Sequence, residues 1–388
     1  MTTTESIVEF LEGRLDTYLD ELRLLSGIDS GTPDKEGVDQ INAWLEERLT
    51  ALGFATKRHP QEKWGDDLEA TLDGSGKGHI MLLGHSDTVY PKGTAAERPM
   101  TIEGDTILGP GTCDMKAGLL TGLYAAAALR EIGFDDFGRI TFLVVSDEEV
   151  SERHSYPLIR ELGRQADAAL TLEAARENGD IVTARKGVRW YTVEAHGKSA
   201  HAGVEPEKGR SAIVALAEHI VALHKLNGYR PDVTINVGTI EGGMVPNAVP
   251  DYAKIVVDVR AFNEEDLEAV TAAIRDQFEQ ETAIPDIRIE MSKGTGSPCM
   301  PLTPEVQALE KLAQEAAREV GFEVKGAKTG GGSDAAVVAA EGTPVLDGLG
   351  PVGGLDHGPD EYIELSSIVP RTAMLARLMM AIAQREKE

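Results

Sequence analysis

The sequence predicts an α/β fold in which a mainly parallel sheet forms the larger domain and a ferredoxin-like domain is inserted into it. Two observations lead to this prediction. Apolar strand-like runs such as HIMLLG and ITFLVVS alternate with helical stretches, which is typical of a parallel sheet covered by helices on both faces. Between residues 184 and 296 this pattern gives way to strands of alternating polarity, and afterwards it resumes. The larger domain is therefore expected to be discontinuous.

The first part of the larger domain is expected to span residues 1–183. Its N-terminal 25 residues carry apolar side chains at helical spacing, which predicts one amphipathic helix. Three strands and two helices should complete this part. The strands are HIMLLG (79–84), ITFLVVS (140–146) and ADAALTLE (166–173), and the helices are LLTGLYAAAALREIG (119–133) and a segment at about 155–162.

The inserted domain is expected to span residues 184–296. Its predicted elements are the strand WYTVEAHG (190–197), a helix at about 210–226, the strands VTINVGTI (233–240) and AKIVVDVRAF (253–262), a second helix, and the strand IRIEMS (287–292). Asn263 is a suitable cap for the second helix, because acidic residues follow it in the first turn. This βαββαβ order is that of the split βαβ, or ferredoxin-like, fold.

The second part of the larger domain is expected to span residues 297–388. Thr303 and Pro304 are typical of a helix start, and Gly321 is typical of a helix end. The glycine-rich KTGGGSDAA (328–336), the strand TPVLDGLG (343–350), the segment DHGPDEY (356–362) and a helix at about 367–385 follow.

Composition excludes several classes of partner. The formal net charge of -27 over 388 residues argues against nucleic acid, which is bound by basic surfaces. Cys113 and Cys299 are too few for a disulfide framework and lack the spacing of a zinc knuckle. The N-terminus has no basic start or apolar signal core, and no stretch approaches the ~20 apolar residues of a membrane span. We therefore expect a cytoplasmic protein without a membrane partner.

Histidines and carboxylates follow the strands of the larger domain at the points where those strands end. They are His85 and Asp87, Asp114 before the second helix, Asp147, Glu148 and Glu149, Glu173, and Asp356 and His357. In open α/β sheets, ligands bind beyond the carboxyl ends of the strands. Imidazole and carboxylate donors without cysteine suit zinc, with cobalt or manganese as substitutes. The carboxylates suffice for two ions that share one bridging group, and a further carboxylate could move protons.

Each of these residues also has an ordinary structural interpretation. Asp114 could simply cap the following helix, and Glu148 and Glu149 could be a solvated pair after a strand. Glu173 could be a surface carboxylate, and His357 a turn histidine. The gathering of all of them at the strand ends favours the metal site.

Seven segments of the chain resemble the co-catalytic zinc peptidase family. They are GHSDTV, GPGTCDMKAG, SDEEVSE, HGKSAHAG, MVPNAVPDYAKIVVDVR, TGGGSDAA and DHGPDEY, which occur in the family's order over most of the chain. This family contains glutamate carboxypeptidase, aminoacylase, acetylornithine deacetylase and succinyl-diaminopimelate desuccinylase, and the resemblance is closest to bacterial glutamate carboxypeptidase. It implies a di-zinc peptidase domain with an inserted lid and dimerisation domain, and hence a homodimer.

The resemblance implies a role for each residue at the strand ends. One zinc ion would be held by His85, Asp114 and Glu173, and the other by Asp114, Glu149 and His357. Glu148 would be the general acid/base, and Asp87 would orient His85. A cis peptide bond would follow the bridging aspartate, between Asp114 and Met115.

The resemblance also implies substrate-binding residues. His201 would stabilise the oxyanion, often from the neighbouring subunit, while Asn247 and Arg260 would hold the terminal carboxylate of the substrate. Gly331 and Gly332, within the 330–332 loop, would offer backbone groups. The alternatives are a surface histidine at 201 and a structural ion pair at 260.

The implied enzyme hydrolyses an N-acyl amino acid or short peptide and releases the C-terminal amino acid. The alternative is a deacylase of the acetylornithine or succinyl-diaminopimelate type; a non-catalytic metal-binding relative is more remote, because Glu148 is retained. An aminopeptidase is disfavoured, since such members tend to carry aspartate at the position of Glu173. Ser297 stands where the folate-hydrolysing member has an arginine, and a lysine after Glu173 is missing. Arg176 and Lys293 are candidate substitutes, so the released residue need not be glutamate.

Overall fold

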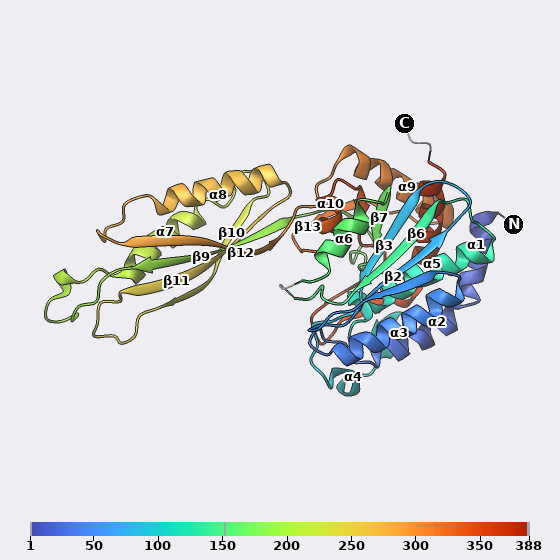
Figure 1. Cartoon of the computed structure of the whole chain (residues 1–388), viewed down its shortest axis with the longest axis horizontal. Helices are drawn as coiled ribbons and strands as arrows, with labels where there is room; N and C mark the ends of the chain where they lie inside the picture. The colour runs from blue at the N-terminus through green and yellow to red at the C-terminus, as the bar shows by residue number, and fades with distance from the viewer. Residues whose placement is uncertain (1, 151–152, 386–388) are drawn as a thin grey trace. The chain divides into compact units, whose positions relative to one another are not determined.

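The computed structural model describes residues 2–150 and 153–385, which form two compact units (Figure 1). Unit 1 consists of Met1–Ala184, Leu302–Thr329 and Ser333–Glu388, and unit 2 of Arg185–Pro301 and Gly330–Gly332. The first division lies within a residue of the expected one. The second lies five residues later than expected, because the backbone of Met300 pairs with that of Arg185 at 2.9 and 3.1 Å.

A six-stranded sheet organises unit 1. Its order is β1 (Ala55–His59), β2 (Asp67–Asp73), β6 (Arg139–Val145), β3 (His79–His85), β7 (Ala168–Thr171) and β14 (Val345–Leu346). The four strands from β6 to β14 are parallel, which confirms the predicted class. The antiparallel strands β1 and β2 were not predicted, because the charged residues of ATKRH and DLEATLD obscure their apolar pattern.

Helices pack around this sheet. They are α1 (Thr3–Glu12), α2 (Leu15–Ser26), α3 (Lys35–Ala51), α4 (Thr94–Glu97), α5 (Ala117–Glu131), α6 (Tyr156–Gly163), α9 (Pro304–Val320), α10 (Ala335–Ala339) and α11 (Ile368–Ala383). The prediction of one N-terminal helix is wrong, since the chain forms α1 and α2. Gly13 ends α1 by donating its N–H to the carbonyl of Glu9, and glycine is a poor helix former.

The core of unit 1 includes α5 and α11, which pack against each other. Gly122 permits the close approach of α5 to the sheet, since a Cβ there would lie 2.9 Å from the ring of Phe142. Contrary to the sequence-based expectation, one segment, Leu365–Ala383, is long and apolar enough to span a membrane. However, 67% of it is buried within the protein, as in the core helix of a globular domain.

Two smaller sheets lie in unit 1. One contains β4 (Thr101–Glu103), β5 (Thr106–Leu108), β16 (Tyr362–Glu364) and β15 (Gly353–Gly354), and the other contains β8 (Ile181–Arg185) and β13 (Gly326–Thr329). The β15–β16 connection carries the segment DHGPDEY, so this small sheet positions one of the predicted metal-binding segments.

Unit 2 has the predicted βαββαβ order of β9 (Gly187–His196), α7 (Ala212–His224), β10 (Thr234–Gly242), β11 (Tyr252–Ala261), α8 (Glu264–Phe278) and β12 (Arg288–Ser297). Its antiparallel sheet has the order β10-β11-β9-β12, which is that of the ferredoxin-like fold (Figure 1). Asn263 caps α8 as expected, accepting a hydrogen bond from the N–H of Asp266. Thr303 and Gly321 likewise begin and end α9 in unit 1.

Candidate metal centre

The strand ends of unit 1 deliver the predicted donors to one edge of the sheet. His85 is the last residue of β3, Glu148 and Glu149 follow β6, and Glu173 follows β7. These three strands are adjacent and parallel, so the loops after them emerge side by side. Asp114 lies in the turn before α5.

The five predicted ligands form two groups around Asp114. In each group the possible donor atoms lie within 4.8 Å of one another; the groups are His85, Asp114 and Glu173, and Asp114, Glu149 and His357. Asp114 Oδ1 lies 2.9 Å from His85 Nε2, and its Oδ2 lies 3.1 Å from His357 Nε2. Asp114 therefore has one oxygen in each group, and its carboxylate meets histidines rather than the N-terminus of α5.

Asp87 lies against the His85 ring. His85 Nδ1 lies 3.0 Å from the Asp87 carbonyl oxygen and 3.4 Å from its Oδ1. This leaves Nε2 directed at Asp114, with Glu173 Oε1 at 3.7 Å. A histidine whose second nitrogen is held by a carboxylate or carbonyl is the usual arrangement for a metal ligand.

The Asp87 carboxylate also accepts hydrogen bonds that the sequence did not indicate. This fully buried group accepts hydrogen bonds from Thr32 Oγ1 at 2.6 Å and from the backbone N–H groups of Glu148 and Glu149 at 3.1 Å each. It therefore holds the loop that carries a predicted ligand and the predicted base.

Glu361 plays the corresponding part for the Asp114 turn, and sequence reasoning missed it. Its carboxylate accepts from the N–H groups of Gly111, Cys113 and Asp114 at 2.8–2.9 Å, and from Tyr90 Oη at 2.7 Å. The available signal was its place in DHGPDEY, four residues after His357. The Asp114–Met115 peptide bond in this turn is cis, as the family resemblance implied.

Glu148 lies beside the two groups and is bonded to an arginine. Arg153 Nη2 donates to Glu148 Oε1 at 3.0 Å, and Arg153 Nη1 pairs with Asp334. Burial raises the pKa of Glu148 to about 7, although the positive charge of Arg153 opposes the shift. A carboxyl group that titrates near neutral pH can both accept and return a proton. Neither Arg153 nor Asp334 was predicted.

The donor set fits divalent cations. Burial and the negative charge of Asp114 raise the pKa values of both Glu149 and Glu173, so these carboxylates lack sufficient positive charge around them. Glu149 Oε1 is buried and has no hydrogen-bond partner among the described residues. A cation in each group would give these oxygens a partner and offset their repulsion. Without a metal ion, the contacts with Asp114 and Glu149 raise the pKa of His357 to about 11. As a metal ligand, His357 would contribute a neutral ring.

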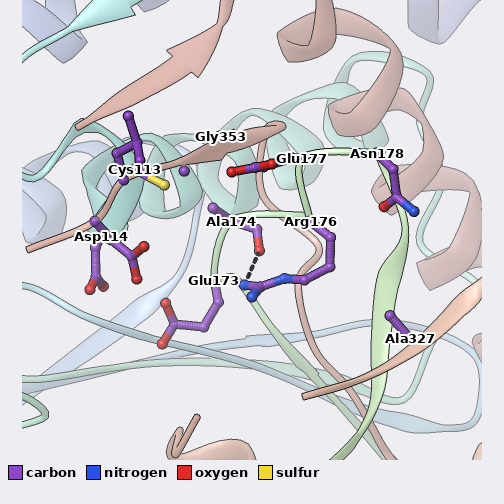
Figure 2. Close-up of a pocket in the computed structure, with 12 residues that line it drawn as sticks. Cys113, Asp114, Glu173, Ala174, Arg176, Glu177, Asn178, Ala327 and Gly353 are labelled. Carbon is purple, nitrogen blue, oxygen red and sulfur yellow. Dashed lines mark hydrogen bonds between the residues drawn. The ribbon is translucent and has the colours of Figure 1, made fainter. Parts of the chain in front are cut away.

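A cavity of about 430 Å³ adjoins these groups (Figure 2). Asp114 and Glu173 contribute to its wall, together with Arg176 and the small residues Ala174 and Gly353. Its volume lies in the ordinary range for a small-molecule site.

The residues predicted to bind substrate from the inserted domain lie in unit 2. The N–H of Ala202 donates to the Asn247 carbonyl at 3.0 Å, so the segments of His201 and Asn247 are paired. The N–H of Gly203 donates to His201 Nδ1 at 3.1 Å. In the neutral ring this leaves the proton on Nε2, the nitrogen that would serve as a hydrogen-bond donor.

Arg260 forms the structural ion pair that was its alternative interpretation. Its Nε and Nη2 donate to the two carboxylate oxygens of Asp258 at 2.9 and 3.0 Å, and its Nη1 donates to the Gly330 carbonyl at 2.8 Å. Three of the five guanidinium N–H groups are thus used. The carbonyls of Gly331 and Gly332 accept from Arg185 Nη1 at 3.4 and 3.1 Å.

Two overlapping groups of imidazole and carboxylate donors lie at the strand ends of an α/β sheet, and beside them lies a carboxyl group whose pKa is raised to about 7. This arrangement is typical of metal-dependent hydrolases. The family model "Peptidase family M20/M25/M40" matches residues 81–381. The chain belongs to this family of metal-dependent hydrolases.

Individual relatives span nearly the whole chain. Carboxypeptidase G2 of Pseudomonas sp. (strain RS-16) is 32% identical over 92% of this chain and 88% of its own length. Acetylornithine deacetylase of Proteus mirabilis (strain HI4320) is 27% identical over 96% of this chain and 99% of its own length. The crystal structure of aminopeptidase PepT from Bacillus cereus ATCC 10987 is similar at a TM-score of 0.83, with 26% identity, and covers 95% of this chain and 99% of its own.

Proposed function

We propose that the protein is a di-zinc amide hydrolase that cleaves an N-acyl amino acid or short peptide and releases its C-terminal amino acid. The observation that carries this proposal is the shared position of Asp114 between two donor groups, with Glu148 beside them. The similarity to carboxypeptidase G2 favours a carboxypeptidase type of cleavage.

The residues that would hold the ions are those of the two groups, namely His85, Asp114 and Glu173 for one, and Asp114, Glu149 and His357 for the other. Zinc is the metal that this mixture of nitrogen and oxygen donors suits best, and cobalt or manganese would be substitutes. Ions in these groups would lower the pKa of a water molecule and polarise the carbonyl of the scissile amide.

Glu148 is proposed to take the proton from the attacking water and to deliver it to the leaving amine. Its pKa of about 7, raised mainly by burial, suits both steps near neutral pH. Asp87 is proposed as the residue that positions this machinery, since it bonds the His85 ring and the backbone of Glu148 and Glu149.

Unit 2 is proposed as the lid. His201 would donate from Nε2 to the oxyanion, because Nδ1 already accepts from Gly203. Asn247 and Arg260 would bind the terminal carboxylate, for which Arg260 retains two N–H groups beyond its bonds to Asp258 and Gly330. Gly331 and Gly332 would contribute backbone groups.

We further propose a homodimer formed through unit 2. Its strand β10 is one of the two edge strands of the sheet. Apolar side chains are exposed on β10 and on the neighbouring helix α7: Ile240 is 56% exposed, Val214 43% and Val221 59%. An open strand edge beside an apolar helix face is suited to pairing with a second copy. Val221→Glu should shift the protein toward monomer in light-scattering measurements, and an unchanged dimer would contradict this assignment.

The second candidate function is a deacylase of the acetylornithine or succinyl-diaminopimelate type, which the similarity to acetylornithine deacetylase favours. The chemistry is the same, and only the acyl group is smaller. A panel of N-acyl amino acids and dipeptides, assayed with zinc-loaded protein, separates the two candidates.

Glu148→Gln tests the mechanism. Turnover should fall by about 10²–10⁴-fold, while elemental analysis should still find two zinc ions per chain. Glu62→Gln, at an exposed position, should behave as wild type and serves as the control. Full turnover by Glu148→Gln would exclude the assigned base. Less than one ion per chain at saturating zinc would exclude the di-zinc enzyme.

A further inference from the structure

The cavity beside the metal groups has an arginine in its wall. Arg176 lies in the loop between β7 and β8, three residues after Glu173. Figure 2 shows its side chain extended along the cavity with the guanidinium end toward Glu173. The cavity lies entirely within unit 1, and both Asp114 and Glu173 line it. A substrate whose amide reaches the ions would therefore have its adjoining part near Arg176.

The backbone of this loop is held in place. The N–H of Arg176 donates to the Asp180 carbonyl at 3.0 Å, and the N–H of Gly179 donates to the Arg176 carbonyl at 2.7 Å. The Gly179 carbonyl in turn accepts from the buried Arg371 at 2.8 Å. The position of Arg176 is thus set before any ligand arrives, which lowers the entropic cost of binding.

The guanidinium of Arg176 lacks a strong acceptor. Within residues 2–150 and 153–385, its one hydrogen bond runs from Nη2 to the Ala174 carbonyl at 3.4 Å, its Nε is buried without a partner, and it forms no ion pair. The other arginines of unit 1 near the site differ: Arg153 pairs with two carboxylates, and Arg371 donates to three carbonyls. A guanidinium fork without a carboxylate partner is suited to take one from a ligand.

We propose that Arg176 binds a carboxylate on the acyl side of the scissile amide. Because the proposed function, on which this inference rests, assigns the terminal carboxylate of the released amino acid to unit 2, the cavity in unit 1 remains for the acyl part. The substrate is then an amino acid acylated by a short dicarboxylic acid, or a peptide with Asp or Glu before the scissile bond. Addition of one water across the C–N bond yields the dicarboxylic acid, or the acidic peptide fragment, and the free amino acid.

The lining of the cavity fits a group of this kind. Ala174, Ala327, Gly353 and Gly354 have small side chains or none, which leaves room beside the guanidinium. Glu177 lies against Gly354, where an added Cβ would come within 3.2 Å of its Oε1. Arg176 is the one cationic side chain among the residues that line the cavity, and an anion there would have to bind at its guanidinium. The acidic residues of the lining are Asp114, Glu173, Glu177 and Asp356.

Binding of the acyl product tests the proposal independently of turnover. With zinc-loaded protein, calorimetry should show that succinate, which has two carboxylates, binds at least ten-fold more tightly than succinamate, in which an amide replaces one of them. Arg176→Gln should weaken succinate binding by about 10- to 100-fold and succinamate binding by less than about three-fold, since only succinate has a second carboxylate that the guanidinium fork can bind while the first faces the metal groups. Arg176→Lys should fall between, because it keeps the charge without the fork. Arg130→Gln, at an exposed position on α5, is the control.

Turnover of N-succinyl and N-succinamoyl amino acids should show the same pattern in kcat/KM. Equal binding of succinate and succinamate by the wild type, or an unchanged preference in Arg176→Gln, would overturn the role of Arg176 even if both substrates are cleaved. If succinate binding depends on Arg176 and neither substrate is cleaved, Arg176 retains its role and the proposed hydrolase function fails.

Discussion

Asp87 connects the imidazole of one metal group to the loop of the other, so Asp87→Asn tests whether a buried carboxylate organises the site. The variant keeps the size of the side chain and replaces one oxygen by an NH₂ group. If that group takes the place of Oδ1, it faces the N–H of Glu148 and the nearby His85 ring. If it takes the place of Oδ2, it faces the N–H of Glu149 and the hydroxyl of Thr32, which can rotate to accept. The second orientation is therefore the less costly one.

The cost of that orientation follows from the bonds that change. One backbone N–H loses its acceptor, which costs about 1–3 kcal/mol in a buried site. The bonds that survive become neutral rather than charge-assisted, which weakens each by about 1 kcal/mol. With two surviving bonds, to the N–H of Glu148 and to Thr32, Asp87→Asn should therefore lower the unfolding free energy of the metal-free protein by about 3–5 kcal/mol. Because His85 also loses a neighbouring charge, zinc affinity should fall by about 10- to 100-fold.

Urea denaturation of the metal-free protein and calorimetric zinc titration measure these two quantities. Asp276→Asn, on the exposed surface of α8 in unit 2, should change stability by less than about 0.5 kcal/mol and leave zinc affinity unaltered. A loss of stability below 1 kcal/mol in Asp87→Asn, together with wild-type zinc affinity, would show that Asp87 does not organise the site.

Three further outcomes are expected. Glu361→Gln should weaken zinc binding in both groups by about 10-fold or more in the same titration, since it loosens the turn of the shared ligand. Arg371→Met should destabilise the protein by about 3–6 kcal/mol, because two buried carbonyls and one partly buried carbonyl lose a donor, whereas Arg377→Met should cost under about 1 kcal/mol. Burial and the charge of Asp147 raise the pKa of Asp67 to about 7. Between about pH 4 and 7, Asp67 then keeps its proton in the folded protein but loses it in the unfolded chain, so stability should fall as the pH rises through this window. Asp67→Asn removes this titration, and the Tm of the variant should therefore fall less over the same pH range.

The class of fold could be predicted because the strands that form the centre of unit 1 are buried on both faces. Burial on both sides makes β3 and β6 continuous apolar runs, and such runs are visible in a single sequence. The strands β1 and β2 contain charged residues and escaped prediction. The break between α1 and α2 was missed because the apolar spacing continues across Gly13, although glycine ends the first helix there.

The grouping of the proposed metal donors could be predicted for a related reason. A histidine or carboxylate directly after a buried strand has a place in space that the topology of a parallel sheet already determines. Arg153 and Asp334 are different, because they are 181 residues apart and neither directly follows a strand of that sheet: Arg153 lies late in the β6–α6 connection, and Asp334 lies between β13 of a smaller sheet and α10. Their pairing depends on where two loops happen to meet, which periodicity and strand order do not specify.

Asp87 and Glu361 show why motifs reveal ligands more readily than the residues that position them. Each carboxylate accepts from backbone N–H groups of a loop that carries ligands, two such groups for Asp87 and three for Glu361. A backbone donor leaves no trace in the sequence, since every residue except proline supplies one. Only the acidic residue itself can be recognised in the sequence, and among five proposed metal ligands it looks like a further ligand. Its place in the site follows only from its bonds: each of these two carboxylates holds a loop that carries a proposed ligand.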